Sequence, residues 1–236
     1  MTGSQERCWA VVPAAGIGTR MDSGLPKQYL EIAGVTIVEH SVKALLASQR
    51  VQGVVVALHA DDSRASTLAV FQDKRVQCVS GGAQRSDSVL AALAALLVQG
   101  ELDDWVLVHD AARPCLQLAD LRRLIDRVCA SDTGGILAEP MVDTVKQAGD
   151  DDRVLRTLDR RRLWRAQTPQ MFRLGPLYAA LEGAKKQGLS ITDEASAMEL
   201  AGHPVQLIMG SPRNLKVTLP ADLELAAWYL RAETDS

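Results

Sequence analysis

Short apolar runs alternate with longer amphipathic segments along most of this chain, and that rhythm leaves few folds open. The runs are rich in β-branched residues, which favour extended structure, and six of them are predicted strands: Cys8–Val12, Val54–Leu58, Val76–Val79, Trp105–His109, Ile136–Glu139 and Val205–Met209. The segments between them are predicted helices: Ile37–Ala47, Ser63–Phe71, Ser86–Val98, Leu118–Cys129, Leu177–Gln187 and Glu194–Leu200. Such alternation indicates an α/β fold with a mostly parallel sheet and helices on both faces.

The composition narrows the kind of partner. Hydrophobic residues make up 47% of the 236 residues but aromatic residues only 4%, so the core must consist mainly of aliphatic side chains. The formal net charge of −3 argues against a protein that binds nucleic acid through bulk electrostatics. An anionic substrate therefore needs locally placed cations.

Location is also constrained. The four cysteines have no paired short spacing of the zinc or redox type, so we expect reduced thiols. The first seven residues are polar with no apolar signal core behind them, and the longest apolar run, Val89–Val98, is too short to span a bilayer. We expect a cytoplasmic protein without a membrane partner.

One segment breaks the alternation. Residues 141–158 form two alternating runs around Gly149 and the acidic stretch Asp150–Asp152, which is typical of a β-hairpin. The runs carry too few large apolar residues for a core element, and an isolated hairpin is marginally stable in water. We therefore expect one domain over 1–236, with 141–165 as an arm that packs on a second subunit. The three adjacent carboxylates are interpreted as a solvated turn.

The segment after the first strand points to a polyphosphate. Small residues at Ala14, Ala15, Gly16 and Gly18 allow backbone N–H groups to approach an anion, and Arg20 and Lys27 add two cations close behind them. No Gly-Lys-Ser/Thr closes the segment as in a P-loop, and Met21 stands where a dinucleotide fingerprint needs its third glycine. The alternative is that the glycines only turn the chain and the cations are solvated.

Asp110 follows a buried strand and is the candidate metal ligand. Mg²⁺ takes one or two protein carboxylates and completes its shell with phosphate oxygens and water. The alternatives for Asp110 are a helix cap or an ion pair with Arg113. His109 points to the opposite face by strand alternation and is interpreted as structural.

Three further segments contain candidate binding residues. Gly81 and Gly82, followed by Ser86 and Ser88, could contact a base or a ribose, or could form a turn with a helix cap at Ser86. A run of arginines offers bidentate phosphate ligands, and which of Arg160, Arg161 and Arg162 is used stays open. Lys216 places a charge inside an extended segment, and residues 190–196 are mostly explained as helix capping.

Together these segments resemble the 2-C-methyl-D-erythritol 4-phosphate cytidylyltransferase family. The matching pieces occur in family order from about Val11 to Trp228: PAAGIGTRM, PKQY, GGAQRSDSV, VHDAARP, VDTVK, LDRRRLW, QTPQ, ITDEAS and NLKVT. The resemblance implies a Rossmann-like sheet of the nucleotide-diphosphosugar transferase type and a homodimer formed through a protruding β-arm. It implies transfer of CMP from CTP to methylerythritol phosphate, with release of pyrophosphate.

The resemblance also implies roles for individual residues. Arg20 and Lys27 would stabilise the reacting phosphorus and the leaving pyrophosphate, and Arg160 and Lys216 would position the acceptor. CTP would be held by Ala14, Ala15, Gly16, Gly18, Gly82, Ser88 and Ala111. Asp110 would bind Mg²⁺, Thr192 would help hold the acceptor, and Thr144, Arg113 and Arg160 would come from the partner subunit, carried by its arm.

Three rival functions remain at this point. The nearest is another nucleotidyltransferase of the same fold, acting on a different sugar phosphate or an acidic sugar. A nicotinamide-dependent dehydrogenase is disfavoured by Met21. A nucleotide-binding scaffold without catalytic activity is the third.

Overall fold

A computed structural model gives the structure of residues 8–16 and 25–234 of the chain. Its centre is a seven-stranded sheet in the order β11-β7-β10-β6-β1-β4-β5. The strands span β1 Cys8–Ala14, β4 Val51–Leu58, β5 Val76–Ser80, β6 Trp105–Val108, β7 Gly135–Pro140, β10 Trp164–Arg173 and β11 Gln206–Met209. Neighbouring strands are parallel except at β10, which runs antiparallel to both β6 and β7.

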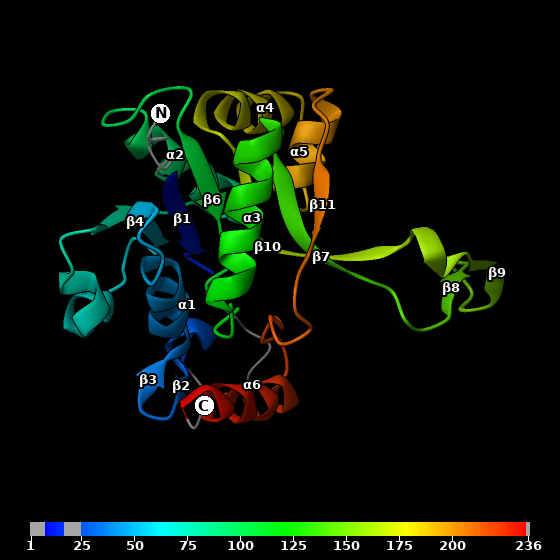
Figure 1. The fold of residues 1–236 in the computed structure, drawn as a ribbon, viewed down its shortest axis with the longest axis horizontal. Coiled ribbons are helices and arrows are strands. Elements are labelled where there is room, and N and C mark those ends of the chain that lie inside the picture. Colours follow the sequence, from blue (N-terminus) through cyan, green and yellow to red (C-terminus); the bar gives the residue numbers. More distant parts are fainter. Residues whose placement is uncertain (1–7, 17–24, 235–236) are drawn as a thin grey trace.

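Helices cover both faces of this sheet, as the alternation predicted (Figure 1). One face packs on α1 Ile37–Leu46 and α3 Leu118–Ser131, and the other on α2 Arg85–Leu96, α4 Leu174–Lys186 and α5 Glu194–Leu200. Alternate residues of β1 enter the two cores: Val12 faces α1 and Val11 faces α2. The predicted fold class is confirmed.

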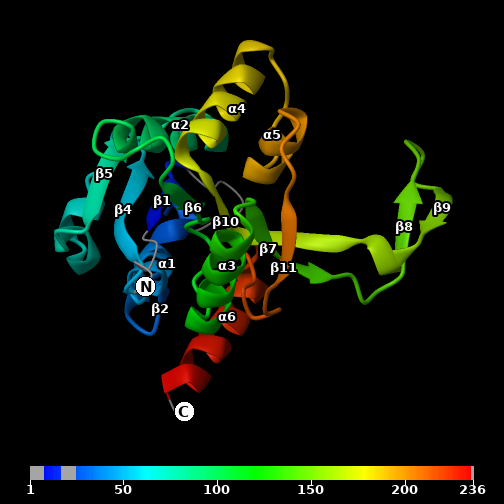
Figure 2. The ribbon, with the colours of Figure 1, turned by 45° about the horizontal axis from the view of Figure 1, so that its top comes forward.

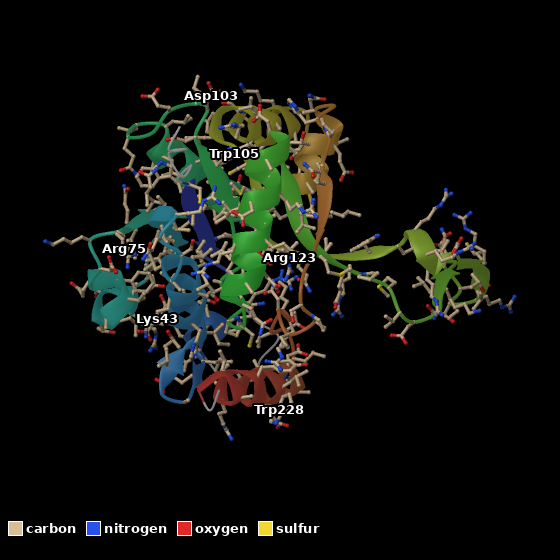
Figure 3. All side chains as sticks on the ribbon, viewed as in Figure 1. Lys43, Arg75, Asp103, Trp105, Arg123 and Trp228 are labelled. Atoms are coloured by element: carbon tan, nitrogen blue, oxygen red, sulfur yellow. The ribbon has the colours of Figure 1, made fainter. Side chains whose placement is uncertain are left out.

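A third, smaller core lies at one end of the molecule. It joins α6 Pro220–Thr234 to the two-stranded sheet of β2 Glu31–Ile32 and β3 Val35–Thr36, through buried Ile32, Val217 and Ala226. Trp228 of α6 is exposed (Figure 3). No strand or helix was predicted in these segments.

One predicted helix was wrong, and one strand of the main sheet was not predicted. Residues Ser63–Phe71 do not form an α-helix; they form the 3-10 turns η2 Ala65–Thr67 and η3 Ala69–Gln72, because Leu68 between them is extended. β10 was not predicted as a strand, because Pro169 and three polar neighbours are atypical of a central strand. The structure accommodates them where the pairing of β10 with β7 is irregular, between Ala166 and Gln170.

The predicted hairpin is confirmed. β8 Val145–Ala148 and β9 Val154–Leu158 pair antiparallel around an exposed acidic turn, and they lie well away from the main sheet in two views (Figures 1 and 2). The short 3-10 helix η4 Arg160–Arg162 returns the chain to β10. Val154 and Leu155 are exposed on the hairpin, so the described residues leave this apolar surface of the arm uncovered.

The surface carries charge on several sides. Lys43 lies on α1, Asp103 precedes β6 and Arg123 lies on α3, where its guanidinium pairs with Asp120 at 2.8 Å (Figure 3). No helix in the part of the chain that the structure describes is long and apolar enough to cross a membrane.

Candidate active site

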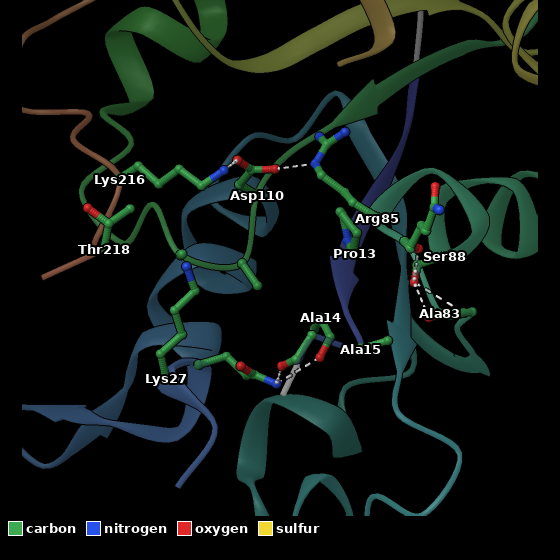
Figure 4. A pocket seen from close by; sticks show the side chains of 16 residues that line it. Pro13, Ala14, Ala15, Lys27, Ala83, Arg85, Ser88, Asp110, Lys216 and Thr218 are labelled. Carbon is green, nitrogen blue, oxygen red and sulfur yellow. Dashed lines mark hydrogen bonds and ion pairs between the residues drawn. The ribbon is translucent and has the colours of Figure 1, made fainter. Parts of the chain in front are cut away.

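A pocket of about 400 Å³ opens beyond the carboxyl ends of β1 and β6, where ligands of such sheets bind (Figure 4). Segments far apart in the sequence meet there. Its described lining residues are Pro13, Ala14, Ala15, Gly16, Lys27, Gln28, Gly82, Ala83, Gln84, Arg85, Ser88, Asp110, Ala111, Ala112, Lys216 and Thr218. Nine of the predicted site residues are in this set. Gly18 and Arg20 lie outside the described residues.

The segment after β1 is held by a residue that was not singled out. Gln28 is buried, and its Nε2 donates to the carbonyl oxygens of Ala14, at 2.8 Å, and Gly16, at 3.0 Å. Because the carbonyl oxygens of Ala14 and Gly16 both accept from Gln28, the backbone of this segment is held in one conformation beside the pocket. A Cβ on Gly16 would meet no atom of the described residues within 4 Å, so this part of the structure leaves open space in front of the backbone.

Lys27 lines the same pocket as Asp110 (Figure 4). Its Nζ donates to the carbonyl oxygen of Val217 at 3.3 Å, which links the first loop to the segment that carries Lys216. The predicted convergence of the Lys27 amine and the Asp110 carboxylate on one pocket is therefore observed.

The second glycine segment packs tightly against the first. A Cβ on Gly81 would lie 2.6 Å from the Cβ of Ala15 and 2.7 Å from the Oγ of Ser88, so only glycine allows this approach. The Ser88 hydroxyl accepts from Gly82 N at 3.2 Å. The predicted helix cap at Ser86 was wrong, since α2 already begins at Arg85 and its cap position is Gln84.

Asp110 is held between two cations. Its Oδ1 accepts from Arg85 Nε at 2.8 Å, and its Oδ2 lies 2.7 Å from Lys216 Nζ (Figure 4). Burial by itself raises the pKa of the Asp110 carboxyl, but the charges and hydrogen bonds of Arg85 and Lys216 outweigh it and keep the pKa well below its usual range. Asp110 is therefore ionised at neutral pH and is neither a helix cap nor a partner of Arg113.

Arg85 is the main functional residue that sequence reasoning missed. Besides Asp110, its guanidinium binds both oxygens of Glu194 at 2.7 and 2.9 Å. The two partners are 25 and 109 residues away in the sequence, so no local pattern could have revealed them. The available signal was an arginine three positions after Gly82.

His109 has the structural role that was predicted. The ring is fully buried, with Nδ1 3.0 Å from the hydroxyl of Thr168 and Nε2 3.1 Å from the carbonyl oxygen of Arg113. It does not line the pocket.

Four predicted acceptor-side residues do not line the pocket of this chain. Arg113 was expected to come from a partner's arm, and that was wrong: it lies between β6 and α3, and its Nη1 donates to the carbonyl oxygen of Asn214 at 2.6 Å. Thr144 and Arg160 do lie on the arm, where both are exposed and the Arg160 guanidinium donates to the carbonyl oxygen of Val142. Thr192 is exposed just before α5, 3.4 Å from the hydroxyl of Ser196.

The carboxylates limit what metal the site can hold. Among the described residues no group of three or more His, Cys, Asp or Glu side chains could bind an ion, and Asp110 is the carboxylate in the pocket lining. One carboxylate fits a Mg²⁺ that takes its other ligands from phosphate and water. A carboxylate has about four lone-pair sites, so Asp110 can accept a further partner beside Arg85 and Lys216.

Comparison with known proteins identifies the family. The sequence profile described as "2-C-methyl-D-erythritol 4-phosphate cytidylyltransferase" matches residues 8–232. The chain belongs to this family. Such membership makes the chain a nucleotidyltransferase of the isoprenoid precursor pathway.

Individual relatives agree with the family over nearly the whole length. A family enzyme of Vibrio vulnificus is 49% identical over 235 residues, covering 100% of this chain and 99% of the relative. One from Pseudomonas syringae pv. tomato is 51% identical, covering 95% of each chain. A crystal structure of 4-diphosphocytidyl-2C-methyl-D-erythritol synthase superimposes with a TM-score of 0.82 at 38% identity, covering 95% of this chain and 99% of that one.

Proposed function

We propose that this chain transfers the cytidylyl group of CTP to 2-C-methyl-D-erythritol 4-phosphate and releases pyrophosphate. The observation that carries the proposal is the convergence of Lys27, Lys216, Arg85 and the Asp110 carboxylate on one pocket, which is bordered by two glycine segments. Counted with Glu194, these side chains carry three positive and two negative charges. An excess of positive charge suits a triphosphate.

The two glycine segments divide the binding of CTP between them. Ala14, Ala15 and Gly16 hold the triphosphate through backbone N–H groups. Gly18 and the cation of Arg20 take part in the same site. Gly82, Ser88 and Ala111 lie in the pocket wall and contact the cytosine and ribose. The fixed contact between Gly81 and Ala15 keeps the two halves of the nucleotide site in register.

Asp110 would hold the Mg²⁺ that accompanies CTP. A bound Mg²⁺ neutralises charge on the triphosphate oxygens. The low pKa of the Asp110 carboxyl means that no proton has to be displaced before a cation binds.

The reaction is an in-line displacement at the α-phosphorus of CTP. A phosphate oxygen of the acceptor forms the new bond to that phosphorus, and the bond to the oxygen that bridges the α- and β-phosphates breaks, so the electron pair leaves with pyrophosphate. Lys27 and Arg20 stabilise the negative charge that accumulates on the transferring and leaving groups. Lys216 positions the acceptor, together with Arg160, Arg113, Thr144 and Thr192.

The active enzyme is a homodimer in the cytoplasm. The exposed Val154 and Leu155 of the arm support dimerisation, because apolar side chains at the end of a projecting hairpin are stabilised by a partner surface. All four cysteines are free thiols, which agrees with a reducing compartment.

Incubation with CTP, Mg²⁺ and one acceptor at a time tests the activity, with pyrophosphate release as the readout. We expect turnover with methylerythritol phosphate and none in its absence. Parallel reactions with other sugar phosphates and with acidic sugars cover the nearest rival. Turnover with one of those acceptors, and none with methylerythritol phosphate, would overturn the proposal.

A further inference from the structure

Four side chains of alternating charge run from the interior of the protein into the pocket. Glu194 pairs with Arg85, Arg85 with Asp110, and Asp110 with Lys216, at 2.7, 2.8 and 2.7 Å. The two ends of the series differ in exposure: the side chain of Glu194 is 1% exposed and that of Lys216 is 40% exposed. Asp110, Arg85 and Lys216 line the pocket, but Glu194 does not.

Glu194 is held rigidly at the inner end of this series. It is the first residue of α5, whose cap residue Asp193 accepts from Ser196 N at 2.9 Å. The helix is also tied to β10, because Ala195 N donates to Gln170 Oε1 at 2.8 Å. A buried carboxylate on a fixed backbone presents both of its oxygens to Arg85 in one direction.

The two hydrogen bonds between Arg85 and Glu194 decide which N–H group of Arg85 faces Asp110. With Nη1 and Nη2 bound to Glu194, Arg85 reaches Asp110 through Nε alone. An arginine without this restraint can bind a carboxylate with two N–H groups in parallel. Such a bidentate pair would occupy both oxygens of Asp110, including the one that now lies against Lys216.

We infer that Glu194 is a positioning residue that restrains Arg85 to a single contact with Asp110. It thereby keeps Arg85 off the second Asp110 oxygen, where a divalent cation bound with the nucleotide can replace the amine of Lys216. Glu194 acts only through Arg85 and touches no substrate. The part of this inference that concerns the cation rests on the proposed function; the restraint on Arg85 does not.

The restraint can be measured without any ligand. In ¹⁵N NMR spectra, the Arg85 Nη–H signals are assigned by their loss in Arg85→Lys, and their exchange with water is compared in the wild type and Glu194→Gln. We expect exchange to be about tenfold faster or more in Glu194→Gln, because the neutral amide cannot keep both Nη groups bound. Exchange within about twofold of the wild-type rate would overturn the inference.

The consequence for the cation is measured by Mn²⁺ binding in the presence of CTP and without acceptor, with free Mn²⁺ followed by electron paramagnetic resonance. We expect the dissociation constant to rise about tenfold in Glu194→Gln. The matched control is Glu182→Gln on the exposed side of α4, whose partner is Lys186 at 2.9 Å, and it should bind as the wild type does. Equal binding by both variants and the wild type would contradict the inference.

A second variant covers the case in which Glu194→Gln does not fold. Glu194→Asp keeps the charge but shortens the side chain by one methylene, so we expect an exchange rate and a dissociation constant between those of the wild type and the values predicted for Gln. Wild-type values for Glu194→Asp, in a protein with an unchanged unfolding temperature, would overturn the inference. If wild-type protein fails to bind Mn²⁺ with CTP, the proposed function fails, and Arg85 exchange still decides whether Glu194 restrains Arg85.

Discussion

His109 shows how a buried polar residue fixes the backbone of the site without entering it. A carbonyl oxygen only accepts, so the ring must donate to Arg113 O from Nε2. In the neutral ring Nδ1 is then an acceptor, and the hydroxyl of Thr168 donates to it. The same hydroxyl accepts from Asp110 N at 3.0 Å. The imidazole therefore orients Thr168, and Thr168 anchors the backbone of Asp110.

This arrangement predicts a pH dependence of stability. Burial, as the largest cause, lowers the pKa of His109 to about 4, whereas an unfolded histidine titrates near 6.5. Between these values the unfolded chain binds a proton that the folded chain does not, so the free energy of unfolding falls as the pH falls, by roughly 2 to 3 kcal/mol between pH 7 and 4.5.

Urea unfolding with EDTA at the two pH values measures this effect. His109→Gln removes the titrating group, and its loss of stability on acidification should be smaller than that of the wild type by that amount. Other acid-sensitive groups are common to both proteins and cancel in the comparison. The same pH dependence in both proteins would contradict the assignment to His109.

At the scale of elements, β10 joins the parallel part of the sheet to its far edge. It lies between β6 and β7 and runs antiparallel to both, and it carries Thr168 to Asp110 and Gln170 to α5. Its Phe172 is buried between helices and sheet on the α4 side. The position of β10 therefore connects the nucleotide pocket with the helix that holds Glu194.

The packing of β10 against the residue before β7 is tight enough to test. A Cβ on Gly134 would lie 2.2 Å from Cδ1 of Phe172 and 3.1 Å from the carbonyl oxygen of Met171. Because neither strand can move freely inside the sheet, we expect Gly134→Ala to lower the free energy of unfolding by about 2 kcal/mol. Chemical denaturation measures it.

Gly183→Ala is the matched control. Gly183 lies inside α4, and within the described ranges a Cβ there would meet no atom closer than 4 Å. The alanine reduces the entropy of the unfolded chain and favours the helix, so we expect stabilisation by about 0.5 to 1 kcal/mol. An equal effect of the two substitutions would show that the contact with Phe172 does not limit the packing.

At the scale of the whole molecule, the pocket and the arm are separate. The arm projects from the side of the body in both ribbon views, and its residues Thr144 and Arg160 do not line the pocket of their own chain (Figures 1 and 2). A second copy of the chain can bring such residues to a pocket that its own fold cannot reach. A shared site between subunits follows from the proposed dimer.

Mixed dimers test this arrangement. Lys27→Ala disables the pocket and Arg160→Ala disables the arm, and each homodimer should retain about a hundredth of wild-type activity or less. In a mixed dimer one site combines an intact pocket with an intact arm. Random pairing makes half of the dimers mixed, so co-expression should restore activity to about a quarter of the wild-type level.

The control for this experiment pairs Lys27→Ala with Lys216→Ala. Both residues line the pocket, so no mixed dimer of these variants contains an intact site, and activity should stay low. If the first mixture is no more active than the second, the site is not shared. A fully active monomer in a sedimentation experiment would lead to the same conclusion.

The sequence by itself determined the features that depend on neighbours in the chain. Alternating apolar runs placed the parallel strands and five of the six predicted helices, and the Gly149 turn marked the hairpin. Ala14, Lys27, Asp110 and Lys216 could be chosen as site residues because each follows a strand or interrupts an apolar pattern. The remaining predicted helix, Ser63–Phe71, does not form, because Leu68 inside it is extended.

Only the tertiary structure decided which charges meet. Asp110 could have paired with Arg113 three residues away, but the fold brings Arg85 and Lys216 to it instead. The attraction between two charges depends on their separation in space and on their burial, and both are known only once β1, β6, α2 and α5 are packed together. The strand β10 likewise could be identified only from the structure, because its polar residues have their hydrogen-bond partners on other elements.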